Sequence, residues 1–91
     1  MKKAVRDYLT MLVIRQFEET VEDLFSRGMV RGTAHPATGQ EAVAVGVCGA
    51  LRRKDYVTST HRGHGHFIAR GGEPARIMAE LFGKATGYSR G

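Results

Sequence analysis

The sequence has little cysteine, only two prolines and no long apolar run. One cysteine among 91 residues cannot form an internal disulfide, which excludes a secreted scaffold held by disulfides and indicates a reducing compartment. The longest charge-free apolar run extends from Ala42 to Leu51, shorter than the roughly 18 residues of a membrane-spanning helix. Lys2 and Lys3 interrupt the start of the chain, so no signal peptide is expected. We therefore expect a cytoplasmic protein without a membrane partner.

Acidic residues are scarce in the second half of the chain. Residues 1–45 hold six basic and six acidic side chains, whereas residues 46–91 hold eight basic and three acidic ones, which accounts for the formal net charge of +5. An anionic ligand or partner near the second half is one explanation, and a solvated basic surface is the other. Few aromatic residues accompany the basic ones, and no base-reading motif is present. Nucleic acid is therefore not an expected partner.

Two helices are predicted in the first half. Over residues 3–27, apolar residues recur at three- and four-residue steps, as in an amphipathic helix, and Gly28 follows where a helix-ending glycine stands. Residues 39–51 are rich in alanine and glycine and form the second predicted helix, which Thr38 and Glu41 would open as a capping box. Glycine inside a helix costs about 1 kcal/mol relative to alanine. Because a close neighbour usually explains such glycines, we expect this helix to be buried on most sides.

The remainder of the chain contains one predicted strand and one further helix. The β-branched and aromatic content of residues 55–60 favours a strand, and Pro74 begins a predicted helix over residues 74–82. The connecting segments are a loop over residues 28–38, a loop rich in histidine, glycine and arginine over residues 61–72, and a tail over residues 83–91 that is expected to be unstructured from Lys84 onward. A single strand cannot form a sheet. Residues 1–91 are therefore predicted to be a single partial domain.

Histidine, arginine and glycine are concentrated directly after the predicted strand, in the segment Thr60-His61-Arg62-Gly63-His64-Gly65-His66. Neutral imidazoles bind zinc or copper, but no carboxylate or cysteine stands close in sequence to complete a site, so a metal is the less favoured explanation. Arg62 beside Gly63 suits an anion, because a guanidinium binds phosphate and glycine lets a ligand approach the backbone. Hydrogen-bonded structural roles are the third explanation. Cys48 is predicted to be a small core residue.

Five motifs stand in an order that matches a known family. They are Ile14-Arg15-Gln16-Phe17-Glu18-Glu19, Gly32-Thr33-Ala34-His35, Gly39-Gln40-Glu41-Ala42-Val43-Ala44-Val45-Gly46, Thr60-His61-Arg62-Gly63-His64-Gly65 and Ala79-Glu80-Leu81-Phe82-Gly83-Lys84. From about Tyr8 to Gly87, the chain resembles the N-terminal part of the alpha subunit of thiamine-diphosphate-dependent 2-oxo acid dehydrogenases. It looks closest to the acetoin dehydrogenase branch, which has histidine at the position of His61, where pyruvate and branched-chain enzymes usually have tyrosine.

The resemblance implies roles for four residues. Arg62 matches the family arginine that binds the diphosphate of the cofactor, and His61 matches the adjacent position that also contacts it. His35 matches a loop histidine near the active centre, and His64 matches a histidine at the cofactor channel. His35 and His64 are therefore the candidate catalytic residues, and His61 and Arg62 are the candidate cofactor-binding residues. The resemblance implies thiamine diphosphate with magnesium, whose ligands lie outside this chain, so no metal ligand is expected here.

The resemblance also implies a fold and a reaction. The fold would be α/β, a thiamine-diphosphate-binding domain in which helices flank a parallel sheet contributed mostly by residues outside this chain. The subunit would be an oxidoreductase of the acetoin or pyruvate type that cleaves a 2-oxo compound and passes the acyl unit to a lipoyl-bearing acyltransferase. Its other partners would be the remainder of the alpha subunit and a beta subunit, in a heterotetramer, and this chain would not be catalytic alone. The alternative from the residues themselves is a freestanding, non-catalytic module that binds an anion or a partner.

Overall fold

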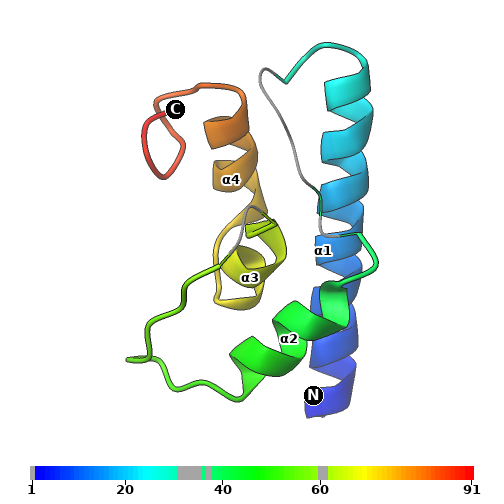
Figure 1. Ribbon diagram of the computed structural model, residues 1–91, viewed down its shortest axis with the longest axis vertical. Coiled ribbons are helices and arrows are strands. Elements are labelled where there is room, and N and C mark those ends of the chain that lie inside the picture. Colours follow the sequence, from blue (N-terminus) through cyan, green and yellow to red (C-terminus); the bar gives the residue numbers. More distant parts are fainter. Residues whose placement is uncertain (1, 31–35, 37, 60–61) are drawn as a thin grey trace.

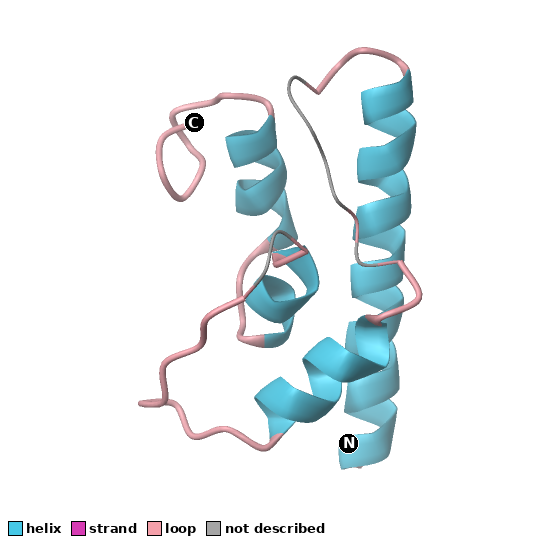
Figure 2. Cartoon of the chain, viewed as in Figure 1, coloured by secondary structure: helices cyan, strands magenta, loops and turns pink. Residues whose placement is uncertain are grey.

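The computed structural model describes residues 2–30, 36, 38–59 and 62–91, and these residues form four helices and no strand. The helices are α1 (Lys3–Ser26), α2 (Glu41–Gly49), α3 (His64–Ala69) and α4 (Pro74–Leu81). Helix α1 runs along the long axis of the molecule, α2 crosses it, and α3 lies between α2 and α4 (Figure 1). Loops and turns make every connection that is described (Figure 2). The fold class is therefore helix-rich, and the described residues alone do not form the expected α/β sheet.

Helix α1 follows from its sequence period. Ile14, Phe17 and Val21 are three and four residues apart, lie on one face and are buried. The helix ends just before Gly28, whose φ of +73° is the left-handed conformation that closes a helix, and the amide of Met29 donates to the carbonyl of Leu24 at 3.0 Å. The helix thus occupies nearly the residues expected from its apolar pattern.

One core joins the four helices. Three residues of α1 meet the buried face of α2, one residue of α3 and one of α4. The members are Ile14, Phe17, Val21, Ala44, Val45, Ile68 and Ile77, with Met11, Ala69, Met78 and Leu81 packed at the edge. The burial of these apolar side chains is the main stabilising contribution that the chain itself provides.

Large apolar side chains remain exposed on α1 and α2. Val43 and Val47 of α2 are 58% and 54% exposed, so the expectation that this helix is buried on most sides is wrong for the chain by itself. Helix α1 likewise leaves a row of apolar residues in solvent, namely Val5, Tyr8, Leu9, Leu12 and Val13. Among the described residues, no helix has both the length and the apolar character required to cross a membrane.

The predicted strand over residues 55–60 does not form. Residues 55–59 have no regular secondary structure, Tyr56 is fully exposed, and residue 60 lies outside the described residues. Strand propensity is expressed only when a neighbouring strand pairs with the backbone, and the described residues offer none. The segment is instead held at its beginning, where the guanidinium of Arg70 donates to the carbonyls of Arg52, Arg53 and Asp55 at 3.2, 3.4 and 2.7 Å.

Two further expectations about the second half are corrected. The segment over residues 61–72 is not a loop throughout, because α3 occupies six of its residues, with Ile68 buried in the core. The tail over residues 83–91 is ordered by contacts. The amides of Ser89 and Gly91 donate to Oε1 of Glu80 at 2.8 and 2.9 Å. The ring of Tyr88 lies 4.9 Å from that of Phe67. Long-range contacts, which local composition does not reveal, decide both segments.

The start of α2 is only half of the expected capping box. Glu41 does reach back, but its Oε2 accepts from the amide of Gly39 at 2.8 Å rather than from that of Thr38. The Thr38 hydroxyl donates to Oε1 of Glu22 on α1, at 3.2 Å, instead of capping a backbone amide. The side chains at this helix start therefore bind α1 as well as their own backbone.

Candidate functional site

The described site residues lie at the start of α3. Arg62 and His64 flank Gly63, which precedes the first turn of that helix. Arg62 is exposed, and its Nε donates to the carbonyl of Pro36 at 3.3 Å, which joins the segment before α3 to the segment before α2. The other two predicted site residues, His35 and His61, lie outside the described residues.

His64 is held by a carboxylate, Glu18, to which none of the sequence motifs gave a role at the site. Its Nδ1 lies 2.7 Å from Oε1 of Glu18, in the middle of α1. Glu18 is fully buried, and the side chain of His64 is 21% exposed. The ring of Phe17 meets the imidazole edge-on, with centroids 5.6 Å apart and the planes at 77°. The imidazole is therefore fixed both by a polar partner and by an aromatic one.

The position of Glu18 could have been found from the sequence. It follows Ile14 by four residues and precedes Val21 by three, so the helical period places a carboxylate on the apolar face of α1. A buried carboxylate requires hydrogen-bond donors, because an unpaired buried charge is strongly unfavourable. The pattern thus indicates that a donor from elsewhere in the chain must reach Glu18.

A second buried carboxylate, that of Glu41, connects the start of α2 to α1. Glu41 is 5% exposed and accepts from Nε and Nη2 of Arg15 at 2.8 and 3.0 Å. The hydrogen bond from Arg15 lowers the pKa of Glu41 from 4.5 to about 2, against the opposing effect of burial, and the amide of Gly39 adds to the lowering. The same hydrogen bond raises the pKa of Arg15. Both groups therefore stay charged at neutral pH.

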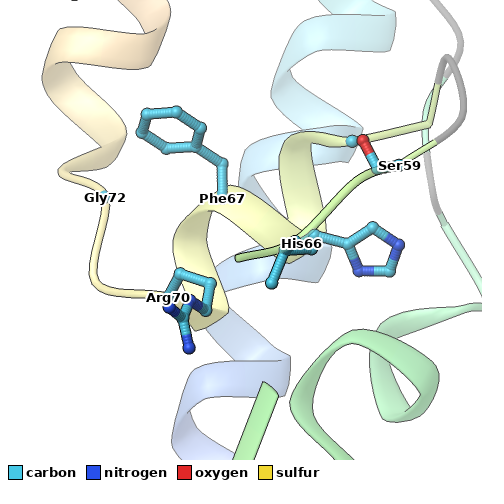
Figure 3. Close-up of a pocket in the computed structure, with 7 residues that line it drawn as sticks. Ser59, His66, Phe67, Arg70 and Gly72 are labelled. Atoms are coloured by element: carbon cyan, nitrogen blue, oxygen red, sulfur yellow. The ribbon is translucent and has the colours of Figure 1, made fainter. Parts of the chain in front are cut away.

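Two small cavities border α3. The first has a volume of about 240 Å³ and is lined by Val57, Ser59, Gly63, His66, Phe67, Arg70 and Gly72. Figure 3 shows the side chains of His66 and Phe67 on α3, and that of Arg70 directly after it, pointing in different directions. The second has a volume of about 290 Å³ and is lined by Ser59, Gly63, His64, Phe67, Ile77, Glu80, Leu81, Tyr88 and Ser89. His64 and His66 therefore line different cavities.

The described residues contain no group of three histidine, cysteine, aspartate or glutamate side chains that could hold one metal ion. His61, the third member of the three-histidine alternative, lies outside them. Cys48 is buried, as expected of a core residue, with Sγ 3.8 Å from the carbonyl of His66. Burial raises the pKa of its thiol, against the opposing charge of Arg70. Within the part of the chain that the structure describes, the site therefore contains a cation, Arg62, and a fixed imidazole, His64.

Comparison with known proteins places the chain in a family. Residues 9–91 match the family described as dehydrogenase E1 component. The chain belongs to this family. It is 53% identical over 90 residues to the alpha subunit of acetoin:2,6-dichlorophenolindophenol oxidoreductase of Bacillus subtilis (strain 168), which covers 99% of this chain and 27% of that relative. It is 46% identical over 84 residues to the pyruvate dehydrogenase E1 component subunit alpha of Porphyra purpurea, which covers 92% of this chain and 24% of that relative.

These matches confirm the resemblance inferred from the five motifs. The alpha subunit of the Cupriavidus necator acetoin:2,6-dichlorophenolindophenol oxidoreductase is also similar, at 44% identity over 84 residues, or 92% of this chain and 25% of that relative. The chain spans about a quarter of the length of the curated relatives that it matches. Among the described site residues, Arg62 and His64 both lie within the part that matches the dehydrogenase E1 component family.

Proposed function

We propose that this chain is the part of a thiamine-diphosphate-dependent dehydrogenase alpha subunit that contributes binding of the cofactor diphosphate. The observation that supports the proposal is the position of Arg62, an exposed guanidinium whose Nε is anchored on the carbonyl of Pro36. That anchor holds a cation at the surface of a chain half in which basic residues outnumber acidic ones. The membership in the dehydrogenase E1 component family supports the same cofactor.

The chemistry of these residues fits a diphosphate. A guanidinium forms charge-assisted hydrogen bonds with phosphate oxygens, and an imidazole adds a further donor or acceptor. In the proposal, Arg62 and His61 bind the diphosphate, and His35 and His64 stand near the reacting part of the cofactor. In the proposal, magnesium is bound by residues outside this chain. When bound, thiamine diphosphate supplies a nucleophilic carbon that attacks the carbonyl of a 2-oxo compound.

The complete protein would act on acetoin or pyruvate and pass the acyl unit to a lipoyl-bearing acyltransferase. Acetoin stands in the name of one of the similar relatives, and pyruvate stands in the name of another. The remainder of the alpha subunit and a beta subunit would supply what this chain lacks, so the chain would not be catalytic alone. The exposed apolar faces of α1 and α2 support the presence of such a neighbour, since a contiguous apolar surface is usually covered in the assembled protein. We place this complex in the cytoplasm.

Titration of thiamine diphosphate into the complete protein tests the proposal. Arg62→Ala removes a charge-assisted hydrogen bond and should weaken binding by roughly 10- to 100-fold. Arg53→Ala is the matched control, because it removes another exposed cation of the same basic half and should leave the affinity unchanged. Equal affinities for the wild type and Arg62→Ala, measured by calorimetry, would contradict the proposal. Reduction of 2,6-dichlorophenolindophenol in the presence of acetoin or of pyruvate would then decide between the substrates.

A further inference from the structure

Glu18 is a carboxylate buried in an apolar surrounding. It is 0% exposed and lies on the face of α1 that also carries Ile14, Phe17 and Val21. Moving a carboxylate out of water costs roughly several kcal/mol, unless hydrogen-bond donors compensate for the lost hydration. The imidazole of His64, which is 46 residues later in the chain and 2.7 Å away, is such a donor. The chain therefore keeps a polar contact at a buried position of a kind where an apolar pair is often at least as stabilising.

The contact determines which nitrogen of His64 carries a proton. An ionised carboxylate only accepts hydrogen bonds, so Nδ1 has to be protonated in order to donate to Glu18. In a neutral imidazole the other nitrogen, Nε2, is then an acceptor. Nε2 has no hydrogen-bond partner among the residues that the structure describes, and the side chain keeps 21% of its surface in solvent beside the second cavity. Phe17 restricts the plane of the ring.

We propose that Glu18 is a positioning residue for His64, which it holds in the tautomer protonated at Nδ1 so that Nε2 accepts a hydrogen bond from a bound ligand. The ligand group at Nε2 is then a donor, such as a hydroxyl, amino or amide group, and not a phosphate or carboxylate oxygen. That a cofactor or substrate reaches His64 rests on the proposed function, whereas the tautomer of His64 does not. The diphosphate oxygens are left to Arg62.

The tautomer is measured directly by nitrogen NMR. We would label the histidine ring nitrogens with ¹⁵N in the complete protein and record spectra of the sedimented sample at about pH 8.5, where an ordinary imidazole is neutral. The signals of His64 are identified by their loss in His64→Gln. A protonated Nδ1 and an unprotonated Nε2 are expected. Protonation at Nε2 alone, in the wild type, would overturn the proposal without any variant of Glu18.

The variant Glu18→Gln tests whether the carboxylate is the cause. Its amide can accept from Nδ1–H or donate to an unprotonated Nδ1, so the preference for one tautomer is lost and a mixture is expected. Glu41→Gln is the matched control, because it neutralises the other buried carboxylate, which pairs with Arg15, and should leave the signals of His64 unchanged. An unchanged Nδ1–H tautomer in Glu18→Gln would overturn the positioning role.

A functional measurement separates this proposal from the proposed function. Glu18→Gln should lower kcat for dichlorophenolindophenol reduction by roughly 10- to 100-fold, the range found when the hydrogen-bond partner of a metal-bound histidine is removed, while the affinity for thiamine diphosphate is kept. Arg62→Ala should instead reduce the affinity for thiamine diphosphate. A lost tautomer preference with unchanged kcat would overturn the role of Glu18 towards the site. An unchanged affinity in Arg62→Ala would overturn only the proposed function.

Discussion

The carboxylate of Glu41 accepts two hydrogen bonds from the guanidinium of Arg15, from Nε at 2.8 Å and from Nη2 at 3.0 Å, and these bonds join the start of α2 to the middle of α1. Glu41 is nearly buried, whereas the side chain of Arg15 is 45% exposed. Three residues after Arg15, Glu18 binds His64 at the start of α3. One stretch of α1 thus fixes the beginnings of the next two helices, α2 and α3.

Loss of Arg15 should loosen α2. In Arg15→Gln, the buried carboxylate of Glu41 keeps the amide of Gly39 but loses its charged partner, so the helix start opens more often. Backbone amides over Glu41–Gly49 are expected to exchange with deuterium about tenfold faster, as measured by mass spectrometry. Arg27→Gln removes an exposed pair with Asp23 on α1 and should leave that exchange unchanged. Identical exchange over α2 in Arg15→Gln would show that this pair does not hold the helix.

The same pair predicts a dependence of stability on pH. Hydrogen bonds from Arg15 lower the pKa of Glu41 to about 2 in the folded protein, against 4.5 ordinarily. The folded state therefore binds fewer protons than the unfolded chain, and the contribution of Glu41 is complete above pH 4.5 and is lost as the pH falls towards 2. The difference in melting temperature between the wild type and Glu41→Gln should shrink across this window. Glu73→Gln, which removes an exposed carboxylate, is the control, and a constant difference for Glu41→Gln would contradict the assignment.

Local sequence signals predict where the helices of this chain lie better than they predict its long-range contacts. The apolar period and Gly28 place α1, and Pro74 places the beginning of α4, because each of these signals acts within one or two turns. Helix α3 was missed because six residues rich in histidine and glycine have little helical preference, and burial of Ile68 stabilises them. The strand over residues 55–60 was predicted wrongly, since its propensity needs a partner strand that the described residues do not contain.

The candidate site was predicted in part for the same reason. The anion-binding interpretation selected Arg62 beside Gly63, whereas His64 was selected only through the family resemblance, and the structure brings both to the start of α3. Glu18 was not selected, because its partner is 46 residues away and no local rule connects the two. The apolar face of α1 nevertheless indicated that a carboxylate at this position needs a donor.

Truncation of the α1 core should destabilise the protein strongly. Ile14 is 0% exposed and belongs to the cluster that joins all four helices. Ile14→Ala is expected to lower the free energy of unfolding by about 2–5 kcal/mol, and Ile14→Val by about 0.5–1.5 kcal/mol. Gln16→Ala, on the exposed side of α1, should have little effect. Equal urea midpoints for Ile14→Ala and Gln16→Ala would contradict this core.

Cys48 should be chemically protected in the folded protein. It is 7% exposed, and burial raises the pKa of the thiol, which lowers the fraction of reactive thiolate. Alkylation by iodoacetamide at neutral pH is expected to be roughly 100-fold slower in the folded protein than in denaturant. The rate is measured by mass spectrometry, from the fraction of the protein that carries the mass of the label at each time point. A folded protein that reacts as fast as the denatured chain would place Cys48 at the surface.

Gly46 distinguishes the chain alone from the complete protein. It lies on the same face of α2 as the exposed Val43 and Val47, and a Cβ built at this position meets no atom within 4 Å. In the 91-residue chain, Gly46→Ala should therefore strengthen α2 by about 0.5–1 kcal/mol, seen as a higher melting temperature by circular dichroism. In the complete protein, the proposed neighbour would cover this face, so the bulkier Gly46→Leu should impair assembly, measured by sedimentation. Normal assembly of Gly46→Leu would mean that this face of α2 stays open to solvent in the complete protein.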